Sequence, residues 1–143
     1  MLVRQILGQM TGSDVITIKP DAPISEAART LSEKKIGAII VTEDGAPIGI
    51  LSERDIVREL GRRGEGCLRG RVSDLMTRAL IVCAPDDTAD LVLTKMTDGR
   101  FRHMPVMQAG AMVGLISIGD VVKARLSELS MEKVALSEMI MGH

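Results

Sequence analysis

Aromatic residues are almost absent from this sequence. Its 143 residues include no tryptophan, no tyrosine and a single phenylalanine, Phe101. Single-stranded nucleic acids are usually bound by stacking on aromatic rings, and a net charge of -1 offers no attraction for nucleic acid or an acidic membrane. We therefore expect neither as a partner. Apolar residues still make up 45% of the chain, so its core must be aliphatic, with ten methionines as flexible fillers.

Metal-binding clusters and long apolar runs are also missing. The two cysteines, Cys67 and Cys83, belong to no CxxC or Cys/His cluster, so we expect no metal site. No apolar run approaches the roughly 20 residues that cross a bilayer. The first ten residues are too short and too polar for a signal peptide. These features together favour a reduced, cytoplasmic protein.

The sequence contains an internal repeat. The stretch GILSERD, Gly49–Asp55, returns as GLISIGD, Gly114–Asp120, 65 positions later. The same shift aligns the chain from Thr17 to Leu126 without a gap. A repeat of this kind indicates two similar units. Because a unit of about 60 residues buries a poor core alone, we expect the two to pack face to face in pseudo-two-fold symmetry.

Each copy predicts the order strand, helix, strand, strand, helix. The first strand is expected at Val15–Ile18 and again at Leu80–Val82. A Pro-Asp turn follows, and its Asp favours a helix start. Apolar residues at helical spacing come next, and then a hairpin with the turn EDG or QAG. The fold class is therefore α/β (α+β), built from two β-α-β-β-α repeats. We expect domains at residues 6–64 and 72–126, a hinge at Gly61–Arg71 and a helical extension at 127–143.

The repeated Ser and Asp have two interpretations. Ser52 with Asp55, and Ser117 with Asp120, match a capping box, in which a hydroxyl and an acid satisfy backbone N–H groups at a helix start. The same geometry suits a ribonucleotide. A helix N-terminus attracts phosphate, and a carboxylate can accept two hydrogen bonds from the vicinal hydroxyls of ribose.

At these residues the chain resembles a tandem pair of cystathionine β-synthase (CBS) domains, a Bateman module of the stand-alone bacterial type. The resemblance is carried by four stretches, MTGSDVITIKPDAPISEAA, KKIGAIIVTEDGAPIGILSERDIV, LMTRALIVCAPDDT and GRFRHMPVMQAGAMVGLISIGDVV. It implies a cleft between the repeats that binds adenosine-containing ligands such as AMP, ADP, ATP, NAD(H) or S-adenosylmethionine.

The resemblance also implies two sets of ligand-binding residues. In the Asp120 site, the acid would hold the ribose beside Leu115, Ser117 and Gly119, and adenine would be framed by Thr17, Ile18, Ala22, Ile36, Gly37 and Ala38. In the Asp55 site, the acid would act with Ile50, Ser52 and Arg54, and the frame would be Val82, Ala84, Phe101, Arg102 and His103.

The two copies differ where charge matters. Gly37-Ala38 aligns with Arg102-His103, and Glu53-Arg54 aligns with Ile118-Gly119. Arg54, Arg102 and His103 are therefore the natural phosphate ligands, while Gly119 lets a phosphate approach the backbone. We expect the two sites to prefer different ligands.

Past Asp120 the helical pattern continues beyond the matching point of the first copy. Val122, Leu129 and Leu136 recur every seven residues, which fits either a helix packed on its own domain or a contact with a partner. Tandem CBS proteins often pair as disc-like dimers, so the resemblance implies a homodimer.

Three functions fit these observations: a regulatory module that senses adenine nucleotides without catalysis, an enzyme acting on a nucleotide, and an interaction scaffold without ligand. No GxSxG, HExxH or Walker pattern is present, and His103 lacks an evident nucleophile and orienting group. The sequence therefore favours the regulatory module, with an as yet unidentified regulated protein as its target.

Overall fold

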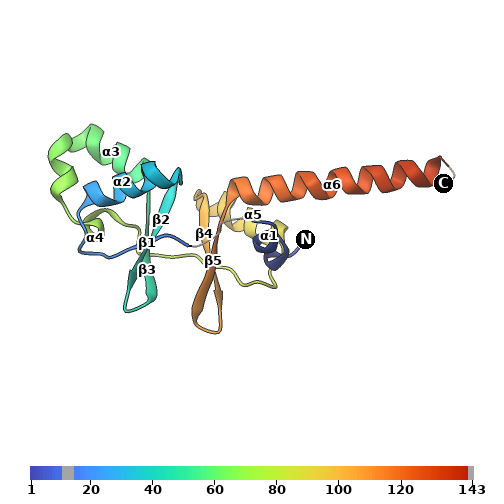
Figure 1. The fold of residues 1–143 in the computed structure, drawn as a ribbon, viewed down its shortest axis with the longest axis horizontal. Coiled ribbons are helices and arrows are strands. Elements are labelled where there is room, and N and C mark those ends of the chain that lie inside the picture. The colour runs from blue at the N-terminus through green and yellow to red at the C-terminus, as the bar shows by residue number, and fades with distance from the viewer. Residues whose placement is uncertain (11–14, 142–143) are drawn as a thin grey trace. The chain divides into compact units, whose positions relative to one another are not determined.

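The computed structural model of the chain describes residues 1–10 and 15–141 (Figure 1). These residues form two compact units, of which one is continuous in sequence and the other combines two separate segments. One unit is Asp14–Ile81, and the other combines Met1–Ser13 with Val82–His143. Of the predicted extension at 127–143, residues 142 and 143 lie outside the described part of the chain.

The unit Asp14–Ile81 contains a three-stranded sheet in the order β1 (Thr17–Ile18), β2 (Ala38–Glu43) and β3 (Ala46–Ser52). β2 pairs with β1 in parallel and with β3 antiparallel. Apolar residues at helical spacing on α2 (Ile24–Lys34) face this sheet and fill the core with Ile39, Val41 and Leu51. Its elements are β1 Thr17–Ile18, α2 Ile24–Lys34, β2 Ala38–Glu43, β3 Ala46–Ser52, α3 Glu53–Arg63, the 3-10 helix η1 Glu65–Arg69 and α4 Val72–Leu75.

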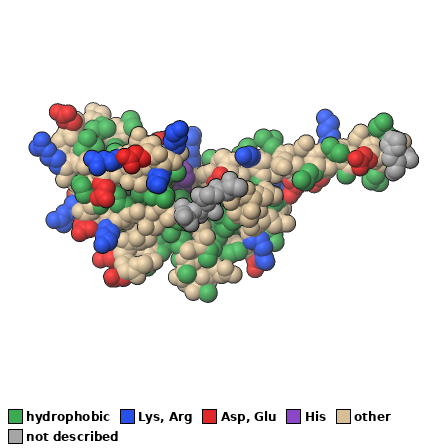
Figure 2. All heavy atoms as spheres, viewed as in Figure 1, with side chains coloured by type: hydrophobic (Ala, Val, Ile, Leu, Met, Phe, Trp, Pro, Cys, Tyr) green, Lys and Arg blue, Asp and Glu red, His purple; other side chains and the backbone are tan. Residues whose placement is uncertain are grey.

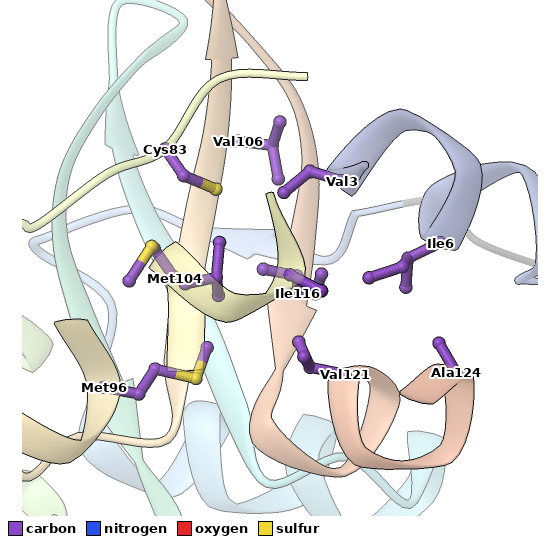
Figure 3. Close-up of a cluster of buried hydrophobic side chains, with 11 residues drawn as sticks. Val3, Ile6, Cys83, Met96, Met104, Val106, Ile116, Val121 and Ala124 are labelled. Carbon is purple, nitrogen blue, oxygen red and sulfur yellow. The ribbon is translucent and has the colours of Figure 1, made fainter. Parts of the chain in front are cut away.

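The other unit is built on the hairpin of β4 and β5. Side chains from the hairpin, from both flanking helices and from the N-terminal helix meet in one aliphatic core, in which Met96 and Met104 fill space between branched side chains (Figure 3). Its elements are α1 Val3–Gln9, α5 Ala89–Gly99, β4 His103–Gln108, β5 Ala111–Ser117 and α6 Ile118–Ile140.

Both predicted hairpins are confirmed. Asp44-Gly45 connects β2 to β3, and Ala109-Gly110 connects β4 to β5. All four residues have positive φ, between 52° and 81°. Two consecutive residues with positive φ make the turn whose twist matches that of antiparallel strands, which explains why glycine stands second in each pair.

Two short helices close the units in matching ways. In α1, the backbone N–H groups of Val3 and Arg4 donate to the carbonyls of Asp87 and Pro85, both at 2.9 Å. In α4, Val72 and Ser73 donate to Ala22 and Pro20 at 2.8 and 2.9 Å. Each helix thus binds the Pro-Asp turn of a repeat, but α1 closes the unit of the second repeat and α4 that of the first.

Three local expectations are wrong. Leu80–Val82 is not a strand, because the parallel ladder of the second repeat shrinks to one bridge, Cys83 with Val106. The helices do not start at Asp21 and Asp86. The N-cap residues are Pro23 and Thr88, and the Thr88 hydroxyl accepts from Leu91 N–H at 3.1 Å.

The stretch Gly61–Arg71 is not a hinge between the units. It finishes α3, forms η1 and stays within the unit Asp14–Ile81, where Cys67 is buried. Arg62 and Arg63 at its start form ion pairs with Glu59 at 3.2 and 3.1 Å.

Cys67 and Cys83 are both free and both buried. Within residues 1–10 and 15–141, no helix has the length and hydropathy that a bilayer crossing requires.

Candidate functional site

The Ser52–Asp55 pair closes the N-terminus of α3 as a complete capping box. Ser52 N–H and Ser52 Oγ–H both donate to Asp55 Oδ2 at 2.9 Å, and Asp55 N–H donates to Ser52 Oγ at 3.2 Å. β3 ends at Ser52, so a strand runs directly into the helix and the acid is held at its first turn.

The Ser117–Asp120 pair repeats this geometry at the start of α6. Ser117 N–H donates to Asp120 Oδ2 at 2.9 Å, and Asp120 N–H donates to Ser117 Oγ at 3.1 Å. The φ and ψ angles of the two N-cap serines agree within two degrees, at -103° and 159° for Ser52 and -103° and 161° for Ser117. The capping-box interpretation is therefore confirmed for both copies.

The capping hydrogen bonds use only some of the acceptor positions of each carboxylate. An ionised carboxyl group has two oxygens and about four acceptor positions, and both caps use Oδ2. Asp55 Oδ1 lies 3.7 Å from Arg58 Nη1, on a side chain that is largely exposed. Both acids are partly accessible to solvent, so the cap and a ligand contact are compatible.

Next to each cap lies the start of the preceding strand. Ala38 is paired with Ser52 in the sheet, and Gly37 carbonyl accepts from Glu53 N–H at 2.9 Å. In the other unit, His103 is paired with Ser117, and Arg102 carbonyl accepts from Ile118 N–H at 2.8 Å. The residues that differ most between the copies therefore lie beside the repeated cap.

The predicted binding residues fall into two groups. The unit Asp14–Ile81 holds Ile50, Ser52, Arg54 and Asp55, together with Thr17, Ile18, Ala22, Ile36, Gly37 and Ala38. The other unit holds Leu115, Ser117, Gly119 and Asp120, together with Val82, Ala84, Phe101, Arg102 and His103. Each predicted frame stands in the unit opposite to its acid, so the pairing of frame and acid stays a prediction.

Within each unit, the predicted binding residues differ in burial and in what they pack against. Thr17 and Ile18 pair with Ile40 and Val41 of β2, and Ile18 is buried in the core. Phe101 packs against the core of the other unit. Arg54, Arg102 and Gly119 are exposed and reachable by a ligand.

The structure adds Thr77 to the neighbourhood of Ile50. The two residues exchange both backbone hydrogen bonds, at 2.9 and 3.0 Å. Thr77 was not among the predicted site residues. The sequence did mark this position, because the Met-Thr pair before the second copy, Met76-Thr77, repeats the Met-Thr pair before the first copy.

Two other aspartates accept backbone N–H bonds at the same spacing without a repeated serine. Asp74 Oδ2 accepts from Arg71 N–H at 3.2 Å, and Asp87 Oδ2 accepts from Ala84 N–H at 2.8 Å. A carboxylate that caps a turn three residues back is therefore common in this chain and does not by itself mark a site.

No group of three or more His, Cys, Asp or Glu side chains able to hold a metal occurs among residues 1–10 and 15–141.

Comparison with known proteins identifies relatives of the whole repeat pair. A family model described as "CBS domain" matches residues 3–62 and 72–127. The crystal structure of a CBS-domain-containing protein from Agrobacterium tumefaciens is 46% identical and covers 87% of this chain and 99% of its own, with a TM-score of 0.84. A CBS domain protein from Pyrobaculum aerophilum, solved in complex with AMP, is 25% identical, covers 92% and 99%, and has a TM-score of 0.77.

Among curated proteins, a mitochondrial CBS domain-containing protein of Arabidopsis thaliana is 34% identical over 127 residues, which is 85% of this chain. The chain spans 62% of that relative's length.

Proposed function

Because the chain belongs to the CBS-domain family, we propose that it is a regulatory module that binds adenine nucleotides and catalyses no reaction. The observation that carries this proposal is the duplicated cap. Two acids at the same point of two units are held with the same two backbone N–H hydrogen bonds and retain acceptor positions for a ligand. The Pyrobaculum aerophilum relative, which was solved with AMP, supports adenosine as the common part of the ligand.

In this proposal each aspartate accepts hydrogen bonds from the two ribose hydroxyls. The cap fixes the side-chain rotamer before the ligand arrives, so little entropy is lost on binding. Ser52 and Ser117 assist at ribose or phosphate, and Ile50 and Leu115 contribute apolar contacts. The predicted adenine frames keep their assignment, with the set from Thr17 to Ala38 for Asp120 and the set from Val82 to His103 for Asp55.

The two sites are proposed to differ in ligand preference. Arg102 and His103 lie beside the Ser117 cap, where the other copy has Gly37 and Ala38. Arg54 on α3 is replaced on α6 by Gly119. Since guanidinium groups make forked hydrogen bonds to phosphate, AMP, ADP, ATP and NAD(H) should not bind the two sites equally.

Regulation requires that the ligand bind one conformation of the module better than another. We propose that a second protein binds the module and responds to this conformational change. The expected cytoplasmic location stays a prediction.

The absence of catalysis in this proposal follows from how the two acids are held. Each aspartate caps its own helix, and this arrangement favours a fixed hydrogen-bond acceptor over a proton-transfer group.

The test combines ligands and variants. Thermal-shift measurements with AMP, ATP, NADH and S-adenosylmethionine identify the binders, and calorimetric titration then measures each site. Asp120→Asn keeps an oxygen for the cap and removes the charge, so it should weaken one site by roughly 10- to 100-fold and leave the other intact. Asp55→Asn should do the reverse, and 2′-deoxy-AMP should bind more weakly than AMP.

Asp74→Asn is the matched control, because it alters the same kind of cap on α4 with no ligand role assigned. Equal affinities in Asp120→Asn, Asp55→Asn and wild type would contradict the ribose role. Turnover of any nucleotide tested would favour an enzyme, and no binding at all would favour a scaffold.

A further inference from the structure

The projecting part of α6 is an apolar surface that neither the core nor the proposed nucleotide sites use. Val121 and Ala124 are its buried residues, and from Leu129 to Ile140 every side chain is exposed. Several large apolar side chains lie there, among them Leu136 at 58% and Ile140 at 78% exposure. Figure 2 shows hydrophobic side chains along this projecting helix, interrupted by charged ones.

The repeat explains why α6 projects. α3 ends at Arg63, and Gly64 follows with φ of 78°, which closes the helix. The residues 65 positions beyond Gly61 and Gly64 are Leu126 and Leu129. Where the first copy has two glycines, the second has two leucines, and α6 runs on for about 17 Å beyond Leu129.

The apolar residues of this helix form a regular seam. Val122, Leu126, Leu129, Lys133, Leu136 and Ile140 follow one another at alternating steps of four and three. These are the a and d positions of a coiled coil, with Val122, Leu129 and Leu136 at d and one charged residue, Lys133, at a. The seam lies on one helix face and leaves Met131 and Val134 outside it.

The position of Lys133 favours one orientation of two such helices. A parallel pair would set Lys133 against Lys133 of the second copy. An antiparallel pair centred near Met131 sets Lys133 against Leu129, Leu126 against Leu136 and Val122 against Ile140 of the second copy.

We propose that α6 of one chain pairs antiparallel with α6 of a second chain, through the seam from Val122 to Ile140. The seam is self-complementary, as a two-fold interface requires. Two stripes about 28 Å long bury less surface than a standard interface. The dimer should therefore exchange with monomer, and its dissociation should depend on concentration. This inference does not rest on nucleotide binding.

Sedimentation velocity over a wide concentration range tests the seam. Leu129→Gln/Leu136→Gln changes two exposed seam residues, so the units should stay folded while the dissociation constant rises by at least about tenfold. Met131→Gln/Val134→Gln makes the same chemical change off the seam and should leave association unchanged. A monomer at all concentrations, or a dimer that survives the seam substitutions, overturns the proposal.

Oxidative cross-linking tests the orientation. A mixture of Leu126→Cys and Leu136→Cys chains should form a mixed disulfide dimer, because the antiparallel seam places these positions opposite each other. Leu136→Cys alone should not cross-link, since its counterpart lies about ten residues away along the seam. Cross-linking of Leu136→Cys alone means a parallel pair and overturns the proposal. Wild type is the control, because Cys67 and Cys83 are both buried.

Discussion

At the scale of single residues, Cys83 shows how far the fold alters a side chain. Burial raises the pKa of the Cys83 thiol from 9.0 to about 11. The nearby Asp87 carboxylate raises this pKa further and Lys95 partly lowers it. The thiol lies in the core of its unit, 3.8 Å from the carbonyl of Pro105, and its neutral form is the one that packs there.

The raised pKa predicts a loss of stability at high pH. Between pH 9 and 11 the unfolded chain releases the Cys83 proton and the folded chain keeps it, so the free energy of unfolding falls as pH rises. The full effect is of the order of 2 kcal/mol. It should appear as a steeper pH dependence of urea unfolding in wild type than in Cys83→Ala. Parallel curves for the two proteins would contradict the assignment.

The helix caps were predictable at this scale because they are local. Ser and Asp three residues apart, after a strand, are enough to satisfy the first N–H groups of a helix, and both copies do so. The starts of α2 and α5 were misplaced by two residues for the same reason. The predicted Pro-Asp turn is present in both units, where α1 or α4 closes it, and the helix starts only after this turn is complete.

At the scale of elements, α4 and β3 approach each other closely at Gly49. A Cβ on this residue would meet Met76 Sδ at 2.6 Å and the carbonyl of Thr77 at 3.1 Å. The backbone contact cannot move away without breaking the pairing of Thr77 with Ile50. This close approach is why glycine is needed in the middle of β3.

Gly49→Ala should therefore destabilise the protein by about 1–3 kcal/mol, the usual cost of overpacking. Gly61→Ala is the control from the same unit. It lies in α3 with open space around its Cα, so alanine should stabilise the helix by about 0.5–1 kcal/mol. Denaturant unfolding measures both, and equal effects of the two substitutions would rule out the packing explanation.

Helices and strands were predicted correctly where the spacing of apolar residues and the residues of the adjoining turn indicate the same structure. The hairpin strands and the apolar faces of α2 and α5 follow from alternation and from helical spacing. It failed at Leu80–Val82, where β-branched composition suggested a strand that finds a ladder partner only at Cys83. Strand formation there depends on tertiary pairing, which composition does not specify.

At the scale of the whole molecule, the compact units cut across the order of the sequence. Val3 and Ile6 of α1 point into the core formed by β4, β5 and α6 (Figure 3), with exposures of 0% and 1%. The equivalent residue of α4, Val72, is buried in the other core. Two short amphipathic segments of similar character could have packed on either hairpin, and sequence pattern alone did not decide between them.

Ile6→Ala should thus weaken the unit of the second repeat. Truncating a fully buried isoleucine costs about 2–5 kcal/mol. Native-state hydrogen exchange should show faster exchange in β4 and β5 and little change in β2 and β3. Ile39→Val, a smaller cavity in the other core, should give the reverse pattern. Faster exchange confined to β2 and β3 in Ile6→Ala would contradict the assignment of α1.

The arrangement of α1 also has a consequence for synthesis on the ribosome. The unit Asp14–Ile81 is complete as soon as its last residue leaves the exit tunnel, and it can fold while translation continues. The helix that precedes it must wait, its buried face uncovered, until β5 has been made more than a hundred codons later. Until then, this apolar face is exposed to chaperones that bind nascent apolar segments.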